Sequence, residues 1–445
     1  MFSYPKDTIM TPELLDELIR KHQKACRRYE RLRKMYEGDH KILSNTKKPD
    51  YKPDNRLVAN FAGYIVDMFN GFFLGIPIKR TLKDDEAANA LMLEIDDRND
   101  QDDSDAEISK NTSIYGHCFE VAYTNEESEP CTALMLPTEG FCVYDDTIDR
   151  EMLFGVRYYN LQGKIEGSFS DTEQIVYFTG GFNGGIVFGD EQPHYFGEVP
   201  VVEYFENAER IGTFEKVETL INAFDKALSE KANDVDYFAD AYLQILGVKL
   251  DEKALQTLRE KRIINLEGEG ADKIVVGFLE KPDSDDTQEH LIDRLERMIY
   301  QLAMVANITD ENFGNASGVS LAYKLQSMNN MAASKERKFV KAMKKRYRLI
   351  MGLPGSRFTE DAWKQITFKF TRNLPNNVSE EVKTAGDLSG IVSKKTQLSV
   401  LSIVDDADEE IRLMQEEADG LPPGVELDRT PGQEGKPGAI EEAAE

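Results

Sequence analysis

The sequence is poor in the residues that build cross-linked or metal-binding sites. Its 445 residues include four cysteines, five histidines and one tryptophan. Four scattered cysteines are too few for a disulfide framework, and no pair has Cys-x-x-Cys spacing. We therefore expect small buried thiols in a reducing compartment. The dispersed histidines form no His-x-x-x-His or Cys/His cluster, so the pattern predicts no zinc site.

Long apolar runs are also missing. The most apolar stretch, 61–78, is interrupted by Asp67, Asn70 and Pro77, whereas a membrane-spanning helix needs about 20 mostly apolar residues. The stretch instead predicts a buried helix followed by a turn. The opening residues MFSYPKDTIM have no apolar core of a signal peptide, so we expect neither a secretory signal nor a membrane partner.

Sequence signatures of catalysis are absent. The chain has no Gly-x-x-x-x-Gly-Lys-Ser/Thr phosphate loop and no Gly-x-Ser-x-Gly nucleophile elbow. Carboxylate pairs are plentiful, but 81 acidic residues produce any spacing by chance. We therefore interpret the chain as non-enzymatic and free of cofactors. A carboxylate-dependent nuclease or hydrolase stays as an alternative, and it requires a compact acidic cluster with a metal.

Positive charge is scarce. Lys and Arg total 54 against 81 Asp and Glu, which gives a net charge of −27. Such acidity argues against a surface that grips phosphate backbones, but it is compatible with a wall past which DNA moves freely. The acids are densest in 84–107. That run contains no glycine, so it does not match a calcium-binding EF-hand loop, and it predicts a solvated helix end or loop.

Apolar residues at spacings of three and four predict long helices. We expect them over 11–37, up to about 71–77, from 213 to 247, from 287 to 306 and over 319–351. On the fourth helix the expected apolar stripe is Leu291, Leu295, Met298, Leu302 and Val305. The basic face of the first helix is compatible with nucleic-acid binding, or with a solvated or intersubunit face that meets acidic neighbours. Shorter helices are predicted at 379–389, 394–404 and 406–418.

Between 118 and 207 the pattern changes to alternating Val, Tyr and Phe, which predicts strands. The glycine-rich FTGGFNGGIVFG within it predicts a hairpin turn. Further short strands are expected at 262–268, 273–280 and 363–372. The tail, 420–445, is rich in Pro, Gly and Glu without aromatics, so we expect it to be disordered.

Four stretches, taken in order, resemble tailed-bacteriophage portal proteins of the Gp6-like (SPP1-type) family. They are NRLVANFAGYIVDMFNGFFLGIPI at 55–78, the helix at 217–247, the run 290–325, and RNLPNN at 372–377 with the later SKKTQLSVLSIVDDADEE. The Asn-Ala-Ser-Gly-Val run at 315–319 is the most distinctive. No single motif decides the resemblance; the ordered set does.

The resemblance implies an α+β portal fold assembled as a ring, usually dodecameric, at one capsid vertex. Double-stranded DNA would enter the procapsid through it during packaging and leave during ejection. Implied partners are the terminase large subunit, head-completion or adaptor proteins, and the major capsid and scaffolding proteins. The implied location is the virion, with assembly in the host cytoplasm. An acidic non-portal scaffold or adaptor is the main alternative.

The resemblance also divides the chain. A wing would comprise 1–228, with a long wing helix and strand at 319–372. Stem helices would lie at 229–247 and 286–306, a small α/β clip at 248–285, a tunnel loop at 307–318, a helical crown at 373–419 and a disordered tail at 420–445.

The tunnel loop is the first candidate site, because its sequence suits weak contact with passing DNA. It contains Asp310 and Glu311 but no Lys or Arg. Its amides and hydroxyl can offer exchangeable hydrogen bonds, and its glycines give backbone freedom. The residues expected to face DNA are Asn307, Asp310, Glu311, Asn312, Gly314, Asn315, Ser317 and Gly318.

The clip is the second candidate site, for docking of terminase and connector proteins. Residues 251–281 are too few to hold a sizeable core alone, so we expect them to pack on copies of themselves. The residues expected to dock partners are Lys261, Arg262, Glu267, Glu269, Asp272 and Lys273.

Overall fold

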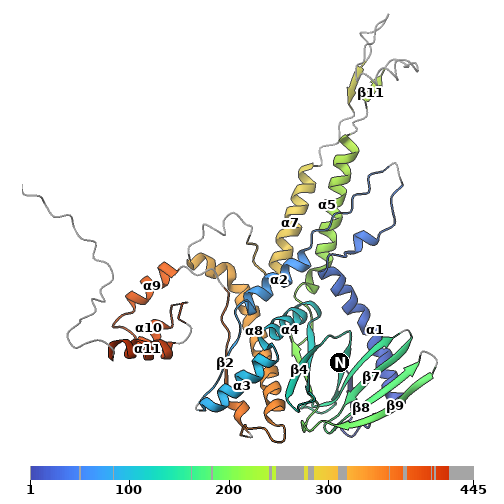
Figure 1. Ribbon diagram of the computed structural model, residues 1–445. Helices are drawn as coiled ribbons and strands as arrows, with labels where there is room; N and C mark the ends of the chain where they lie inside the picture. The colour runs from blue at the N-terminus through green and yellow to red at the C-terminus, as the bar shows by residue number, and fades with distance from the viewer. Residues whose placement is uncertain are drawn as a thin grey trace, which may run out of the picture. The chain divides into compact units, whose positions relative to one another are not determined.

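The chain divides into two compact units, residues 1–373 and 374–445 (Figure 1). The computed structural model describes residues 2–49, 52–83, 85–161, 163–181, 184–239, 243–246, 275–278, 285–308, 318–359, 361–373, 378–401, 403–404 and 407–419.

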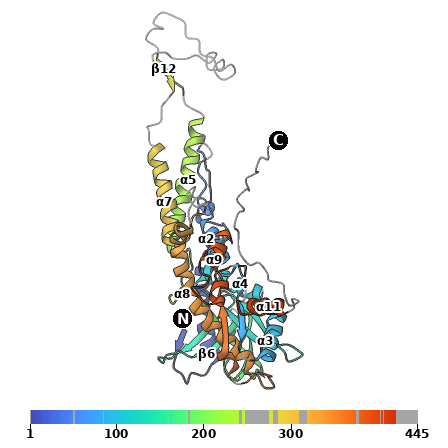
Figure 2. The same ribbon diagram turned by 90° about the vertical axis from the view of Figure 1, so that its left-hand side faces the viewer.

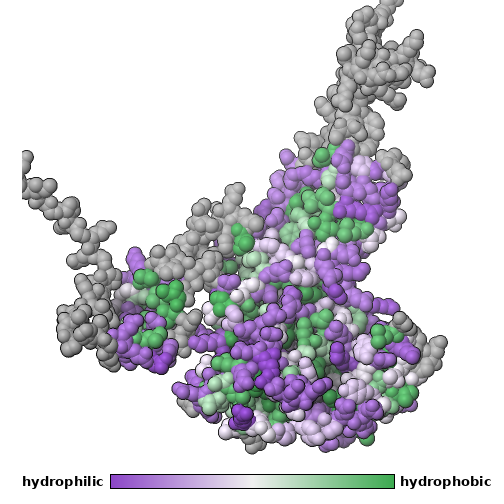
Figure 3. Space-filling view, in the orientation of Figure 1, coloured by the Kyte–Doolittle hydropathy of each residue, from purple (hydrophilic) through white to green (hydrophobic). Residues whose placement is uncertain are grey.

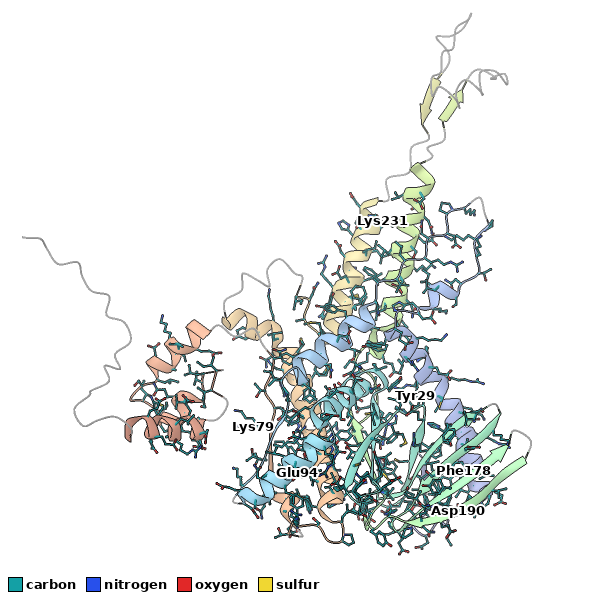
Figure 4. The ribbon with its side chains drawn as sticks, viewed as in Figure 1. Tyr29, Lys79, Glu94, Phe178, Asp190 and Lys231 are labelled. Atoms are coloured by element: carbon teal, nitrogen blue, oxygen red, sulfur yellow. The ribbon has the colours of Figure 1, made fainter. Side chains whose placement is uncertain are left out.

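The first unit opens with a long helix packed on a sheet. Helix α1 (Pro12–Tyr36) begins where the sequence predicted, because the Thr11 side chain accepts a hydrogen bond from the Leu14 amide (3.2 Å) and proline occupies the first turn. Its face carrying Leu15, Leu18 and Ile19 packs against the sheet. Figure 4 labels Phe178, which lies in this shared core.

That sheet has six strands in the order β1-β5-β6-β7-β8-β9. Strand β1 pairs parallel with β5, and the remaining neighbours are antiparallel. Gly181 of β8 lies opposite Gly184 of β9, which confirms the predicted hairpin. The strands are β1 (Phe2–Tyr4), β5 (Gly140–Asp145), β6 (Met152–Leu161), β7 (Lys164–Ser170), β8 (Gln174–Gly181) and β9 (Gly184–Pro193).

A second layer is built around helix α8 (Gly318–Met351), which confirms the helix predicted over 319–351. It packs near the sheet β10-β3-β4 and the apolar helix α2 (Phe61–Leu74), whose Phe69 and Phe73 are fully buried. The other elements of this layer are α3 (Glu86–Arg98), α4 (Gln101–Tyr115), β3 (His117–Thr124), β4 (Pro130–Met135) and β10 (Val201–Phe205). A small sheet of β2 (Lys79–Leu82) and β13 (Ile366–Lys369) closes it. The strand predicted at 363–372 is therefore shorter, since 362–365 form a 3-10 turn.

The acidic run 84–107 corrects the sequence interpretation. It forms α3 and the start of α4, and two of its acids are buried rather than solvated. Asp105 accepts hydrogen bonds from Arg80 and Arg346, both at 2.6 Å. Burial raises the pKa of Asp96 to about 6, and the Tyr347 hydroxyl donates to it at 2.8 Å. The prediction was wrong for these two acids because their partners are distant in sequence.

Two of the basic residues of α8 are internal cations. Arg346 also donates from Nε to Glu120 at 2.7 Å. The second internal cation of α8 is Lys335, which is fully buried. The Lys335 ammonium lies 2.7 Å from Glu206 and donates to the Ser109 carbonyl (2.9 Å) and the Ser113 hydroxyl (2.8 Å). These charges fix α8 to the sheet and to α4.

The long helix predicted from 213 to 247 is shorter. A 3-10 turn (Glu215–Val217) leads into α5 (Glu218–Ala239). Leu243–Leu246 is strand β11, which pairs antiparallel with β12 (Val275–Phe278). The helical prediction was therefore wrong for these four residues, because a short apolar run fits either state until a partner strand is present. The strand predicted at 273–280 is confirmed in part, and 262–268 lies outside the described residues.

Helix α7 (Asp285–Ala303) starts slightly before the predicted cap and ends before Val305. In the second unit, helices α9 (Val378–Asp387), α10 (Lys394–Leu398) and α11 (Ala407–Asp419) confirm the three helices predicted there, although α10 ends earlier than expected. The Ser393 side chain caps α10, as the sequence indicated.

Replacing the buried cation tests its role in the fold. We expect Lys335→Met to lower the free energy of unfolding by about 3–5 kcal/mol, because the Glu206 carboxylate would be left buried without a cation. The measurement is urea denaturation of the unassembled subunit. Lys341→Met on the exposed side of α8 is the control and should change stability little. Equal effects of the two variants would contradict a special role for Lys335.

Candidate functional site: the α5–α7 helix pair and the base of the following loop

Helices α5 and α7 lie side by side and antiparallel, as Figures 1 and 2 show. Toward the C-terminal end of α5, Lys231 forms an ion pair with Glu289 of α7, and Gln288 donates to Asp234 at 3.0 Å. Figure 4 labels Lys231 between the two helices. Polar contacts thus join the end of the pair that continues into β11.

Aromatic rings join the opposite end of the pair. Phe61, at the start of α2, contacts Phe224 of α5 and Tyr300 of α7 edge-on, at centroid distances of 4.9 and 5.6 Å. Tyr64, one turn later, also packs on Tyr300 at 5.6 Å. Burial raises the pKa of Tyr300 to about 12. The first turn of α2 is therefore wedged between the two helices and holds them together there.

The same wedge anchors the start of the predicted tunnel loop. The Tyr64 hydroxyl is 3.4 Å from the Ala306 carbonyl, and the Ala306 amide is 3.3 Å from the sulfur of Met328 on α8. Asn307 donates from its side chain to Glu296 of α7 at 3.3 Å. Three helices therefore meet at the point where the chain enters the loop.

The structure describes two of the eight predicted loop residues. Asn307 lies at the loop base, and Gly318 is the first residue of α8. The other six lie outside the described residues: Asp310, Glu311, Asn312, Gly314, Asn315 and Ser317. All six candidate clip residues also lie outside: Lys261, Arg262, Glu267, Glu269, Asp272 and Lys273.

Helix α7 has two apolar faces, and the residues of the predicted stripe are divided between them. Ile292, Leu295 and Ile299 are buried toward the rest of the unit. Leu291, Met298 and Leu302, which were predicted to lie on one apolar stripe with Leu295, are 50%, 38% and 52% exposed. Figure 3 shows green, apolar residues gathered over the α5–α7 pair. The spacing of seven and four residues places the exposed three along one line of the helix, next to the buried face.

The pair is also acidic. Each helix carries five acidic and two basic residues. A phosphate backbone close to these helices would meet net negative charge, which disfavours tight binding.

A buried histidine ties α5 to the end of α1. The His40 side chain has no exposed surface, and its Nδ1 lies 2.5 Å from Oδ2 of Asp225. Its Nε2 faces the Met35 carbonyl at 3.1 Å. Because a carbonyl and a carboxylate both accept, the arrangement places protons on both ring nitrogens. Burial alone would lower the pKa of His40, but the hydrogen bond and charge of Asp225 outweigh it and raise the pKa above 6.5.

The basic face of α1 meets acids of its own chain. Arg28 forms a two-pronged contact with Glu215 (Nε to Oε1, 2.7 Å), and Arg31 lies 3.1 Å from Glu218. One of the two expectations for this face was a solvated or intersubunit surface that meets acidic neighbours, and for these two arginines the acidic neighbours lie within the same subunit. These pairs join α1 to the start of α5. Part of the basic face of α1 therefore stabilises the contact between two helices of the same subunit.

The described residues offer no group of three or more His, Cys, Asp or Glu side chains arranged to hold a metal ion. All four cysteines are free, and Cys131 is the most exposed of them. Within the described part of the chain, no helix combines the length and apolarity needed to cross a membrane.

Comparison with known proteins gives the family of this chain. The model of the family described as phage portal protein, SPP1 Gp6-like, matches residues 15–421. This chain is a member of the phage portal protein family. The portal protein of Bacillus phage SPP1 is 25% identical over 400 residues, covering 83% of this chain and 77% of the relative. The portal protein of Clostridium phage phiCD119 is 23% identical over 399 residues, covering 84% and 88%.

Membership supplies a coarse function and place. Phage portal proteins are virion components of the capsid vertex, with roles in genome packaging and in connecting head and tail. The family implies a ring at that vertex and association with DNA, and it is generally structural rather than enzymatic. The mixed helices and sheets are consistent with an α+β portal fold.

The anchoring residues were not found by sequence reasoning. Tyr64 appeared only as part of an apolar helix, and Asp225 as an ordinary acid in a long helix. A signal was present, since Asp225, Ser229 and Asn233 interrupt the apolar pattern of α5 at intervals of four. Polar residues on one line of a mostly buried helix indicate partners, but not which ones.

The His40–Asp225 pair predicts a pH-dependent stability. A raised folded-state pKa means that the stabilisation is fully present below the unfolded pKa, about 6.5, and is lost as pH rises through the folded value. We expect His40→Gln to cost about 2 kcal/mol at pH 6, and less as the pH rises toward 9. Urea titrations of both proteins across this range measure it. The exposed His290→Gln is the control; a cost for His40→Gln that is independent of pH would contradict the charged pair.

Proposed function

We propose that copies of this chain close into a ring, dodecameric as the family resemblance implies, whose bore carries double-stranded DNA into the procapsid and out again. In this proposal the stem lies at 229–247 and 286–306, which include the outer part of α5 and nearly all of α7. Residues 248–285 form the clip that docks terminase and head-completion proteins, and residues 307–318 form the tunnel loop. The remaining parts keep the wing and crown assignments given above, and the ring assembles in the host cytoplasm with capsid and scaffolding proteins. The observation that carries the proposal is the family match over residues 15–421.

The exposed face of α7 supports ring closure. Leu291, Met298 and Leu302 offer an apolar line on a helix whose other apolar face is already satisfied within its own subunit. A lone subunit gains nothing from exposing three large apolar side chains to water, whereas a neighbouring copy would bury them. In a ring, each subunit presents this line to the next one by a head-to-tail contact that closes.

The charge of the stem supports free passage of DNA. Each phosphate that is neutralised by Lys or Arg adds a salt-dependent contribution to affinity, and about six to ten such contacts make a stable complex. With five acids to two bases on each helix, the stem avoids such contacts. The Asn and Ser residues of the tunnel loop then offer only weak hydrogen bonds to passing phosphates.

Ring closure is tested by a charge on the exposed line. We expect Leu302→Asp to leave the subunit folded but to prevent ring formation, because a carboxylate would be buried at the contact. Light scattering should then report a mass near 50.5 kDa instead of a many-fold multiple, and negative-stain images should lose the top view with a central hole. Ile148→Asp, at a 96% exposed position, is the control. Normal rings from Leu302→Asp would remove this face from the contact, and a wild-type chain that stays a lone subunit would overturn the proposal.

The tunnel loop is tested by adding the charge it lacks. We expect Asn315→Lys to slow packaging severalfold, because every subunit would add a phosphate contact inside the bore. Gly314→Pro should also impair packaging by restricting the backbone. The amount of DNA per particle is the readout, and Thr172→Lys in the exposed β7–β8 turn is the matched control. If both loop variants package normally, the loop does not meet the DNA.

A further inference from the structure

Residues 52–59, here called the strap, run along α5 in the opposite direction. Figure 1 shows the strap within the blue segment beside α5. The Asn55 amide donates to Oδ1 of Asn233 (2.6 Å), the Leu57 amide to the Ser229 hydroxyl (2.9 Å) and the Ala59 amide to Oδ1 of Asp225 (2.9 Å). Every second amide of the strap is thus bound to every fourth side chain of the helix.

The spacing explains why the two elements match. Two residues of extended chain advance about 6.6 Å, and four residues of α-helix advance about 6 Å. An extended segment can therefore place alternate amides opposite one line of an α-helix over two full steps. The intervening amides, of Arg56 and Val58, point away from this line. The strap is held by a ladder of side chain–backbone bonds in place of a partner strand.

The ladder is linked to the rest of the unit at its Asp225 end, and a further bond to α5 closes its other end. At one end Asp225 uses Oδ1 for the strap and Oδ2 for His40, so the same carboxylate joins the strap, α5 and the segment after α1. The Ser229 hydroxyl donates to the Asp225 carbonyl at 2.7 Å while it accepts from the strap. At the other end the Asn55 side chain donates to Asp236 at 2.5 Å.

Polar bonds rather than apolar burial hold the strap. None of its residues is buried, and Leu57, its largest apolar side chain, is 40% exposed. A segment with few buried apolar contacts opens at low free energy compared with the core. The strap can therefore release α5 without unfolding of the unit, and the three rungs determine how firmly it holds.

We propose that the strap fixes the position of α5 relative to the rest of the first unit, and that Ser229 and Asn233 are positioning residues for DNA passage. The inference rests on the proposed function, since α5 matters as a stem helix that leads to the docking end of the channel. With the strap attached, α5 is held on one side by α7 and on the other by the ladder. With it loosened, the outer half of α5 keeps the α7 contacts and the exposed Lys48–Glu230 ion pair, and its far end is held less firmly.

The attachment is tested by hydrogen exchange resolved to single amides on the assembled wild-type protein. We expect Asn55, Leu57 and Ala59 to exchange more slowly than Arg56 and Val58. In Ser229→Ala the Leu57 amide should exchange about tenfold faster, the effect of losing one hydrogen bond. Lys226→Ala, on the exposed side of α5, is the control. Equal exchange at alternate amides, or an unchanged Leu57 rate in Ser229→Ala, would overturn the ladder.

The positioning role is tested by a pair of substitutions at Asn233. Asn233→Leu removes the acceptor for the Asn55 amide, whereas Asn233→Asp keeps it. We expect rings of normal mass from both, with packaged DNA reduced severalfold in Asn233→Leu and restored to within about twofold by Asn233→Asp. A loosened strap with normal packaging refutes the positioning role and leaves the proposed ring intact. A wild-type protein that forms no ring refutes the proposed function, and this role with it.

Discussion

The pairing of buried cations on α8 with acids from distant segments is the constraint on which the first unit depends. Lys335 and Arg346 lie three turns apart on one helix and reach Glu206, Asp105 and Glu120. Each charge is tolerable only because its partner is in place, since an isolated buried charge costs several kcal/mol. The sheet, α4 and α8 must therefore assemble in one arrangement. That rigid frame is what the α5–α7 pair and the loop base are attached to.

Attachment of the helix pair follows a different principle. At the base, aromatic rings of α2 fill the space between α5 and α7, and His40 with Asp225 adds a charged link. Farther out, hydrogen bonds and the Lys231–Glu289 ion pair replace apolar burial. Aromatic contacts thus give way to polar ones along the pair, from the frame toward β11. In the channel proposed above, such an arrangement would combine a fixed bore with an end that can adjust to its partners.

Most helices and strands were predicted from the sequence, because long helices show apolar residues at spacings of three and four and strands show alternating apolar residues. Sequence reasoning identified α1, α2, α8 and the hairpin, and it missed what depends on contacts across the chain. Asp96 and Asp105 were predicted to be solvated, because the residues next to them in sequence do not show that Arg80 and Arg346 will pack against them. Leu291, Met298 and Leu302 were placed on one stripe with Leu295, because periodicity marks an apolar face without saying whether its partner is in the same subunit. Leu243–Leu246 read as helix because its partner strand lies about thirty residues away. The ladder on α5 could not be predicted from the sequence, because its donors are backbone amides, which nearly every residue has.

The described helices of the second unit bury few apolar side chains. Among its described residues only Ala385 and Leu398 are buried apolar side chains, while Val382, Ile391, Ile403 and Leu413 are exposed. The described helices therefore bury too little apolar surface among themselves to outweigh the entropy lost when they become fixed. Neighbouring copies in the proposed ring would offer these exposed side chains apolar surface to pack against. In the proposed ring, the C-terminal helices would therefore gain stability when the subunits assemble.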